Sequence, residues 1–331
     1  MEGNIQSRNA AIDISRGIAA LLMIISHLGL HNEVEAFIFS FHMPLFFFIS
    51  GMTMHEEKKL GQYLKKRIRR IFIPYVIFAL IYSNPEIIDW IYCLSGTRAG
   101  LKIAGSLHPL WFLPCLFSAD VIFHLVLKYC RKEKVMCLVS IVLAFFGIAI
   151  RFFLPFGITL PFGFDVAMVS IPFVLIGYSL WLKTTLIHRV KENPGICILA
   201  IIGMLTVLLF TYSRNLPPSA TNGVHHVEMA TGSYGNVFLF YFNSIIGSLS
   251  VILFSELMSE RLNLIKNFGN CTMACLVSHW GILSVMEKIG NSLGINGVAY
   301  QFVTVIVIVI AAFGVNRVLE EYAPNLIGKS G

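Results

Sequence analysis

The sequence predicts an all-α, polytopic membrane protein, built as a bundle of about ten transmembrane helices. Hydrophobic residues make up 56% of its 331 residues and charged residues only 13%, whereas a soluble domain has roughly 25% charged residues. The mean hydropathy is +0.75, and apolar runs long enough to cross a bilayer core of about 30 Å recur along the chain. Because almost all of the chain would be embedded, we expect residues 1–331 to form a single integral membrane domain.

The apolar runs define the individual spans. They lie near residues 11–30, 36–54, 71–92, 109–129, 135–154, 165–183, 195–213, 237–258, 270–290 and 298–317. Polar residues at 84–86 and Asp89 interrupt the third run, so there we expect a short span followed by an interfacial or re-entrant piece. Charged residues in the first run favour an uncleaved span over a signal peptide that is removed.

Basic residues are concentrated in alternate linkers. The basic linkers are residues 55–70, 128–134 and 183–191, with Lys58 in the first and Lys183, Arg189 and Lys191 in the third, and the segment that contains Arg261 and Lys266. The positive-inside rule then predicts that both termini are cytoplasmic. The same rule accounts for the net charge of +7, so we expect no nucleic-acid partner.

The first span, AIDISRGIAALLMIISHLGL, contains Asp13, Arg16 and His27. The eleven-residue step from Arg16 to His27 is almost three helical turns, which predicts one shared face and a separation of roughly 16 Å along the axis. An ionisable group at bilayer depth costs about 2.5–3.5 kcal/mol, so such a stripe indicates a functional site. Histidine is the usual general base for a hydroxyl near neutral pH. Arg16 suits a phosphate or carboxylate, or an internal ion pair with Asp13.

Three further side chains in apolar runs are candidate substrate-binding residues. His42 lies near the outer end of the second span, where it could approach His27. Trp111, in HPLWFLPCLFSAD with His108 and Asp120, could line a sugar-sized cavity or belong to the interfacial aromatic belt. His279 is a second candidate for a buried functional histidine.

The outer loop 214–236 contains three side chains that could bind a metal. His225, His226 and Glu228 lie close together there, but their spacing matches no strong metal pattern. Polar side chains in a loop that faces water account for them more simply. We therefore expect no metal.

The basic linker 55–70 ends in Arg67-Ile68-Arg69-Arg70. Arg67 and Arg70 are spaced i, i+3, which predicts one helix face at the membrane surface. Such a pair suits a phosphorylated ligand on the cytoplasmic side. Contact with anionic lipids is the alternative interpretation.

These motifs, taken in order, make the chain resemble the membrane acyltransferase-3 family over nearly its whole length. The resemblance rests on IDISRG with its Arg-x10-His helix, FHMPLFFFISG, the RxxR that precedes IPY, LWFL, and GNCTMACLVSHWG near the end. It is closest to short members, similar to sugar O-acetylases, that lack an appended extracellular SGNH domain.

The resemblance implies transfer of an acyl group, usually acetyl from acetyl-CoA, to a carbohydrate hydroxyl. It also implies that the protein lies in the cytoplasmic (inner) cell membrane. It implies that Arg16 and His27 are catalytic-site residues and that Arg67 and Arg70 hold the CoA phosphates. We add that His27 deprotonates the acceptor hydroxyl and that Asp13 orients Arg16. The expected partners are a lipid-linked or surface glycan and membrane lipids. The sequence specifies neither the sugar, nor the acyl group, nor the oligomeric state, nor whether transfer passes through an acyl-histidine.

The charged residues of the first span also fit two other classes of function. In a secondary transporter, Arg16, His27 and Asp13 would form a proton or anion relay. No inverted repeat is recognisable, which weighs against a transporter. In a membrane scaffold or sensor the same charges would be structural.

Overall fold

A computed structural model describes residues 2–54, 59–155, 157–182, 192–215, 226–295 and 297–327. The α-helices in it are α1 (Glu2–Ile25), α2 (Asn32–Phe39), α3 (His42–Met52), α4 (Leu60–Arg67), α5 (Ile73–Tyr82), α6 (Ile87–Leu94), α7 (Arg98–Ile103), α8 (Phe112–Tyr129), α9 (Glu133–Ile150), α10 (Phe164–Leu182), α12 (Pro194–Thr211), α13 (Val237–Leu257), α14 (Asn263–Asn270), α15 (Thr272–Leu293) and α16 (Val298–Tyr322). Short helical turns are η1 (Ile68–Phe72), η2 (His108–Trp111), η3 (Pro161–Gly163), η4 (Tyr212–Arg214), η6 (Met229–Thr231) and η7 (Pro324–Ile327). Within these ranges the protein is all-helical, as predicted, and its β pairing is a single isolated bridge between Glu228 and Ser233.

Within the described ranges, seven helical segments are long and apolar enough to cross a membrane. They are Asn32–Met52, His108–Tyr129, Glu133–Ile150, Pro161–Leu182, Pro194–Arg214, Val237–Leu257 and Val298–Tyr322. Each matches one of the ten predicted spans, so the protein is a multi-pass membrane protein. The count of ten stays a prediction.

The other three predicted spans have helices that are less apolar or shorter. α1 carries Asp13 and Arg16 in its middle, and α15 carries Glu287 and Lys288 in its second half. The run 71–92 is divided between α5 and α6 by a bend. The interruption expected from its polar residues is therefore present.

Some predicted features fall outside the described residues. They are Lys58, the basic linker 183–191 with Lys183, Arg189 and Lys191, and His225.

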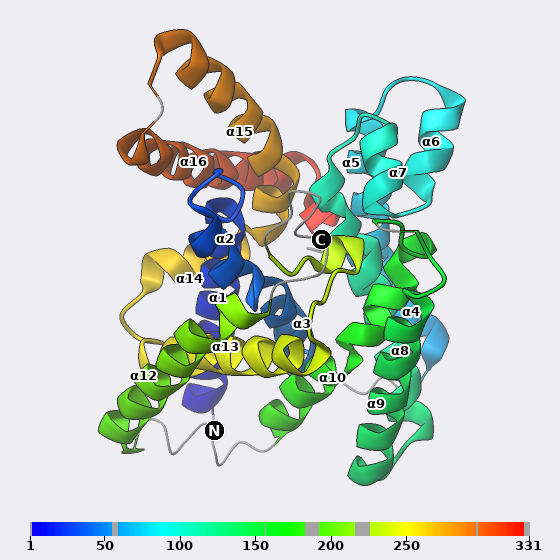
Figure 1. The fold of residues 1–331 in the computed structure, drawn as a ribbon, viewed down its shortest axis with the longest axis vertical. Coiled ribbons are helices and arrows are strands. Elements are labelled where there is room, and N and C mark those ends of the chain that lie inside the picture. The colour runs from blue at the N-terminus through cyan, green and yellow to red at the C-terminus, as the bar shows by residue number, and fades with distance from the viewer. Residues whose placement is uncertain are drawn as a thin grey trace.

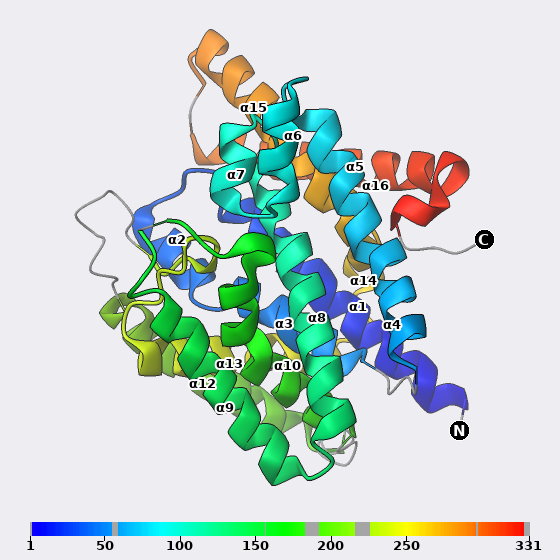
Figure 2. The same cartoon turned by 90° about the vertical axis from the view of Figure 1, so that its right-hand side faces the viewer.

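Most of the other helices form three groups around α1, α2 and α3. In Figure 1, α15 and α16 lie at the upper left, α5, α6 and α7 at the upper right, and α8, α9, α10, α12 and α13 below. Figure 2 shows α8 and α10 between the viewer and α3. The strongest pairings join α3 to α10, α9 to α10, α1 to α14 and α15 to α16. The core therefore forms around α1, α3, α8 and α10, whose side chains supply most of the main cluster of buried residues.

Lipid-facing surface is supplied mainly by α9, α12 and α16. Only 17%, 11% and 17% of their most apolar segments are buried inside the protein. Large apolar side chains such as Phe145, Leu199 and Phe302 project from them. Because hydrocarbon is the solvent at this depth, these exposed side chains are expected of a membrane protein.

Small residues bring α3 and α10 into backbone contact. A Cβ added at Gly51 would lie 2.0 Å from the carbonyl oxygen of Val174, and one added at Gly177 would lie 2.0 Å from that of Phe48. Small residues permit such close approach of two helices in a membrane.

Gly51→Ala is expected to destabilise the protein by about 1–3 kcal/mol, because the added methyl group would force α3 and α10 apart. Thermal unfolding of the purified protein in detergent measures the change. Gly203→Ala, in the middle of α12 with no atom within 4 Å of the added Cβ, is the control and should leave stability unchanged or slightly higher. Equal unfolding temperatures for the Gly51 variant and the wild type would contradict the close packing.

α4, η1 and α5 form one continuous helical segment with a π-helical turn in its middle. The turn spans Ile68–Phe72, directly after Arg67 and before Pro74. It packs against α8 and against η7 at the end of the chain. Single π turns inside helices often occur at functional sites.

Candidate functional site

His27 lies just beyond the end of α1. The helix was predicted to continue to residue 30, but it ends at Ile25, and the amide of His27 donates to the carbonyl of Ile24 at 3.1 Å in a tighter turn. The cause is local: Gly29 has a φ of +63°, a left-handed conformation that a helix cannot contain. His27 is therefore held at the helix terminus, where its ring projects beyond the last helical turn.

Aromatic rings surround His27. Its ring is stacked on His279 with the centroids 5.8 Å apart, and it meets Trp280 edge-on at 5.2 Å and Phe39 at 6.1 Å. Phe39 in turn contacts His42 at 4.9 Å. The structure thus brings together three histidines that the sequence placed in the first, second and ninth predicted spans.

Backbone carbonyls hold Nδ1 of the two other histidines. Nδ1 of His279 lies 3.0 Å from the carbonyl oxygens of both Cys275 and Leu276, and Nδ1 of His42 lies 3.0 Å from that of Ile38. A carbonyl only accepts, so Nδ1 of each ring is the donor, and in the neutral ring Nε2 carries the lone pair. Among the described residues, Nε2 of His279 has no hydrogen-bond partner.

Three cavities meet at His27, and within the described part of the chain no other side chain lines all three. The largest, of about 590 Å³, lies between the turn after α1 and the helices α15 and α16. It is within the usual size range of small-molecule sites. Its polar lining is His27, Trp280, Ser284, Glu287, Asn291, Tyr300, Gln301 and Thr304. We call it the α15–α16 cavity.

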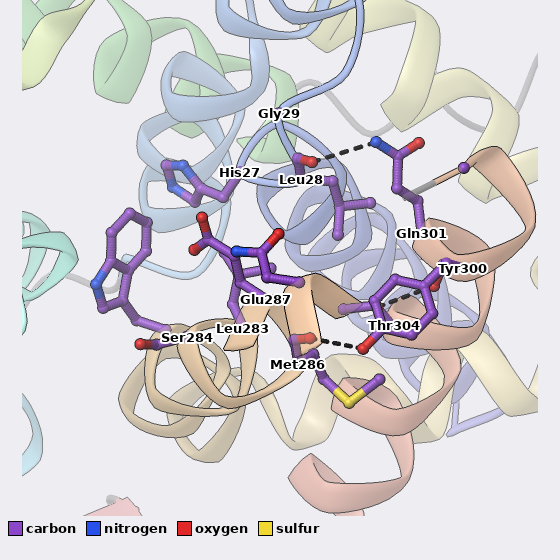
Figure 3. Close-up of a pocket in the computed structure, with 13 residues that line it drawn as sticks. His27, Leu28, Gly29, Leu283, Ser284, Met286, Glu287, Tyr300, Gln301 and Thr304 are labelled. Atoms are coloured by element: carbon purple, nitrogen blue, oxygen red, sulfur yellow. Dashed lines mark hydrogen bonds between the residues drawn. The ribbon is translucent and has the colours of Figure 1, made fainter. Parts of the chain in front are cut away.

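Figure 3 shows how the walls of this cavity are held. The side-chain amide of Gln301 donates to the carbonyl of Leu28 at 3.4 Å, and the hydroxyl of Tyr300 donates to that of Met286 at 2.6 Å. Glu287 projects into the space from α15, on the same side as His27. These contacts tie α16 to both α15 and the turn that carries His27.

The second cavity, of about 40 Å³, contains the other predicted substrate residues. His42, Trp111 and His108 line it together with His27. Arg98 and Glu228 also line it and form a two-point ion pair at 3.1 and 3.3 Å. Residues 228–230 therefore lie beside these histidines.

The third cavity, also about 40 Å³, is almost wholly apolar. Its lining residues are Met23, His27, Met43, Phe46, Pro109, Trp111, Phe112, Thr272 and Leu276. We call it the apolar pocket.

Arg16 and Asp13 lie apart from the cavities. Their side chains form an ion pair at 3.1 Å, and neither is among the described lining residues. Arg16 lies more than two helical turns before the end of α1 at Ile25, and His27 follows that end. Their backbone is held tightly by α14, since a Cβ added at Gly269 would lie 1.8 Å from the carbonyl oxygen of Asp13.

Arg67 and Arg70 have different surroundings. Arg67 pairs with the fully buried Asp120 at 3.2 Å, and the hydroxyl of Ser50 donates to the other oxygen of that carboxylate at 2.5 Å. Arg70 is exposed. Because η1 is a π turn, an i, i+3 pair across it does not share a face as it would in an α-helix.

Several site residues were missed by the sequence analysis. Trp280, Ser284, Glu287 and Asn291 follow the spacing i, i+4, i+7, i+11, so they form one polar stripe along α15. A search of the ninth apolar run for polar residues at helical spacing would have found this stripe. Arg98 carried no such signal, because it begins the short helix α7 and its pairing with Glu228 joins segments 130 residues apart in sequence.

The fold and the site together define the class of this protein. It is a multi-pass helical membrane protein with a histidine where polar and apolar cavities meet. Residues 9–317 match the model of the acyltransferase-3 family, described as an acyltransferase domain. The chain belongs to this family, which confirms the resemblance, and it is a membrane acyltransferase. No curated protein and no solved structure is significantly similar to the chain.

Proposed function

We propose that this protein transfers an acyl group, most simply acetyl, from cytoplasmic acyl-CoA to a hydroxyl of a cell-envelope or exported carbohydrate. One observation carries the proposal beyond the family: His27, a residue able to move a proton, lies where a large polar cavity meets a small apolar one. An acyltransferase needs both, because the acceptor is polar and the acyl chain is not.

His27 acts as the general base in this proposal. It takes the proton of the acceptor hydroxyl while the oxygen attacks the thioester carbonyl carbon. The carbon–sulfur bond then breaks, the thiolate leaves with the electron pair, and His27 returns the proton to it. The products are the carbohydrate ester and CoA thiol, and the imidazole ends neutral. Asp13 holds Arg16 by their ion pair, and Arg16 stabilises negative charge on the donor side.

The acceptor occupies the α15–α16 cavity. Trp280 offers an aromatic face, and Glu287, Asn291 and Gln301 offer hydrogen-bonding groups. Such a set suits the hydroxyl groups of a sugar. The additional substrate contacts are His42 and Trp111 in the second cavity and His279 behind His27.

The donor binds from the side of the basic linker. Arg67 and Arg70 hold the CoA phosphates, with Arg67 shared between phosphate and Asp120. η7, at the C-terminal end of the described chain, contacts η1, which directly follows Arg67. This contact supports a common cytoplasmic side for the basic linker and the C-terminus. In this proposal the protein lies in the inner cell membrane, with the N-terminus on the same side.

Arg70→Ala is expected to raise KM for acetyl-CoA about tenfold, because a charged hydrogen bond to phosphate contributes roughly 1.5 kcal/mol. The kcat should stay unchanged, since this binding is the same in ground and transition states. Initial rates over a range of acetyl-CoA concentrations measure both constants. Arg131→Ala, an exposed arginine of another basic linker, is the control. An unchanged KM in the Arg70 variant would exclude Arg70 from the donor site.

The proposed activity is tested with radiolabelled acetyl-CoA and membranes that contain the protein or lack it. Label in glycan only where the protein is present would support it. With inside-out vesicles acetyl-CoA should be used directly, and with sealed right-side-out vesicles it should not. Label that accumulates inside vesicles without ester formation would favour transport instead.

A further inference from the structure

We propose that the apolar pocket beside His27 binds the acyl group of the donor and limits its length to about that of acetyl. This inference rests on the proposed function. It assigns a binding site for a short acyl group, which the family membership alone does not locate.

The walls of the pocket are apolar and rigid. Met23, Phe46, Phe112 and Leu276 are all less than 10% exposed. His27, Thr272 and Trp111 are its members that carry a polar group. The hydroxyl of Thr272 donates to the carbonyl of Gly269 at 2.6 Å, so its hydrogen is already used within the chain. A pocket of this composition favours a hydrocarbon group and disfavours a charged one such as succinyl.

Aromatic rings close the pocket. The rings of Phe46 and Phe112 are 5.3 Å apart, and Phe47 contacts Phe112 from behind at 5.6 Å. Phe47 is fully buried. Packed interiors yield little to an added group, so this wall sets a limit on length.

The volume of the pocket agrees with a two-carbon group. It is about 40 Å³, and one water-sized group needs roughly 10–15 Å³ on the same measure. About three such groups fit, which equals the three heavy atoms of acetyl. A butyryl group adds two methylenes for which the walls leave no room.

The position of the pocket places it on the donor side of His27. Met23 precedes His27 by four residues, about one helical turn toward Arg16. Thr272 and Leu276 are likewise one turn apart, at the start of α15, whereas the α15–α16 cavity begins further along that helix at Trp280. An acyl group in the pocket and a sugar in the larger cavity would therefore approach His27 from different sides.

The experiment compares acetyl-, propionyl-, butyryl- and hexanoyl-CoA as donors for the intact protein in membranes. In the wild type, kcat/KM should fall about tenfold or more for each added methylene. Phe46→Ala, which removes the end wall, should raise the ratio of butyryl to acetyl transfer by at least about tenfold. Met43→Ala, at a half-buried position in the wall of the pocket, should raise the same ratio by a smaller factor. It keeps the test available if the Phe46 variant does not fold.

Phe145→Ala removes a ring of the same size from the lipid-facing surface of α9 and should leave the donor ratios as in the wild type. Unchanged ratios in both pocket variants, with acetyl transfer retained, would overturn the pocket assignment and leave the proposed function standing. Wild-type transfer of hexanoyl as fast as acetyl would do the same. No transfer from any acyl-CoA, in folded protein, would overturn the proposed function and this inference with it.

Discussion

Replacing His27 by alanine is expected to reduce acyl transfer about 10²–10⁴-fold, the usual contribution of a general base. The loss should appear in kcat more than in KM for acetyl-CoA, because proton removal belongs to the transition state. His27→Gln, which keeps a similar size and hydrogen-bonding capacity, should be equally inactive. The measurement is transfer of label from acetyl-CoA to glycan at equal expression.

His31→Ala is the matched control for this variant. His31 is an exposed histidine four residues further along the chain, so its removal should leave turnover unchanged. Thermal unfolding in detergent shows whether the His27 variants are folded. Full activity of folded His27→Ala would show that His27 is not the general base. Nε2 of the neighbouring His279, which has no hydrogen-bond partner among the described residues, would then be the next candidate.

Arg67→Ala is expected to lower the free energy of unfolding by about 3–5 kcal/mol, because it leaves a buried carboxylate without its partner. The side chain of Asp120 is fully buried and that of Arg67 is only 18% exposed. Asp120→Ala should have an effect of similar size for the reciprocal reason. Chemical or thermal unfolding of the purified protein measures both.

The double variant Arg67→Met, Asp120→Leu separates structure from donor binding. Replacing both charges by apolar side chains should restore most of the stability, since no charge is left unpaired. If Arg67 also binds CoA phosphate, this stable variant should still show a raised KM for acetyl-CoA. A normal KM would assign Arg67 to the fold alone. Stability in Arg67→Ala equal to that of the wild type would contradict the buried ion pair.

The sequence was most informative where one pattern dominates. Seven of the predicted spans correspond to long apolar helices, because a continuous run such as 237–258 leaves the chain no alternative in hydrocarbon. It was less informative for helices with mixed faces. α1 and α15 do not reach the same apolarity, because they carry charged residues such as Arg16 and Glu287. Hydropathy alone does not separate such helices from amphipathic surface ones.

The site was predictable only in part for a related reason. His27 was identified from a local rule, the cost of a polar side chain in an apolar run. Its contacts with His279 and Trp280 depend on packing between helices more than 240 residues apart, as the ring contacts show. The separate surroundings of Arg67 and Arg70 depend on a π turn, which has no spacing signal of its own.

That π turn has a further consequence for the register of the chain. A π turn amounts to one extra residue in an α-helix, so the segment before Ile68 is out of phase with α5 by about 100°. Deleting one residue from Ile68–Phe72 would restore a regular helix and rotate α4 about its axis by that amount relative to Pro74. Arg67 would turn away from Asp120, and another face of α4 would meet α8. A single inserted residue thus decides which basic side chain of this linker is enclosed by the bundle and which is presented to the solvent.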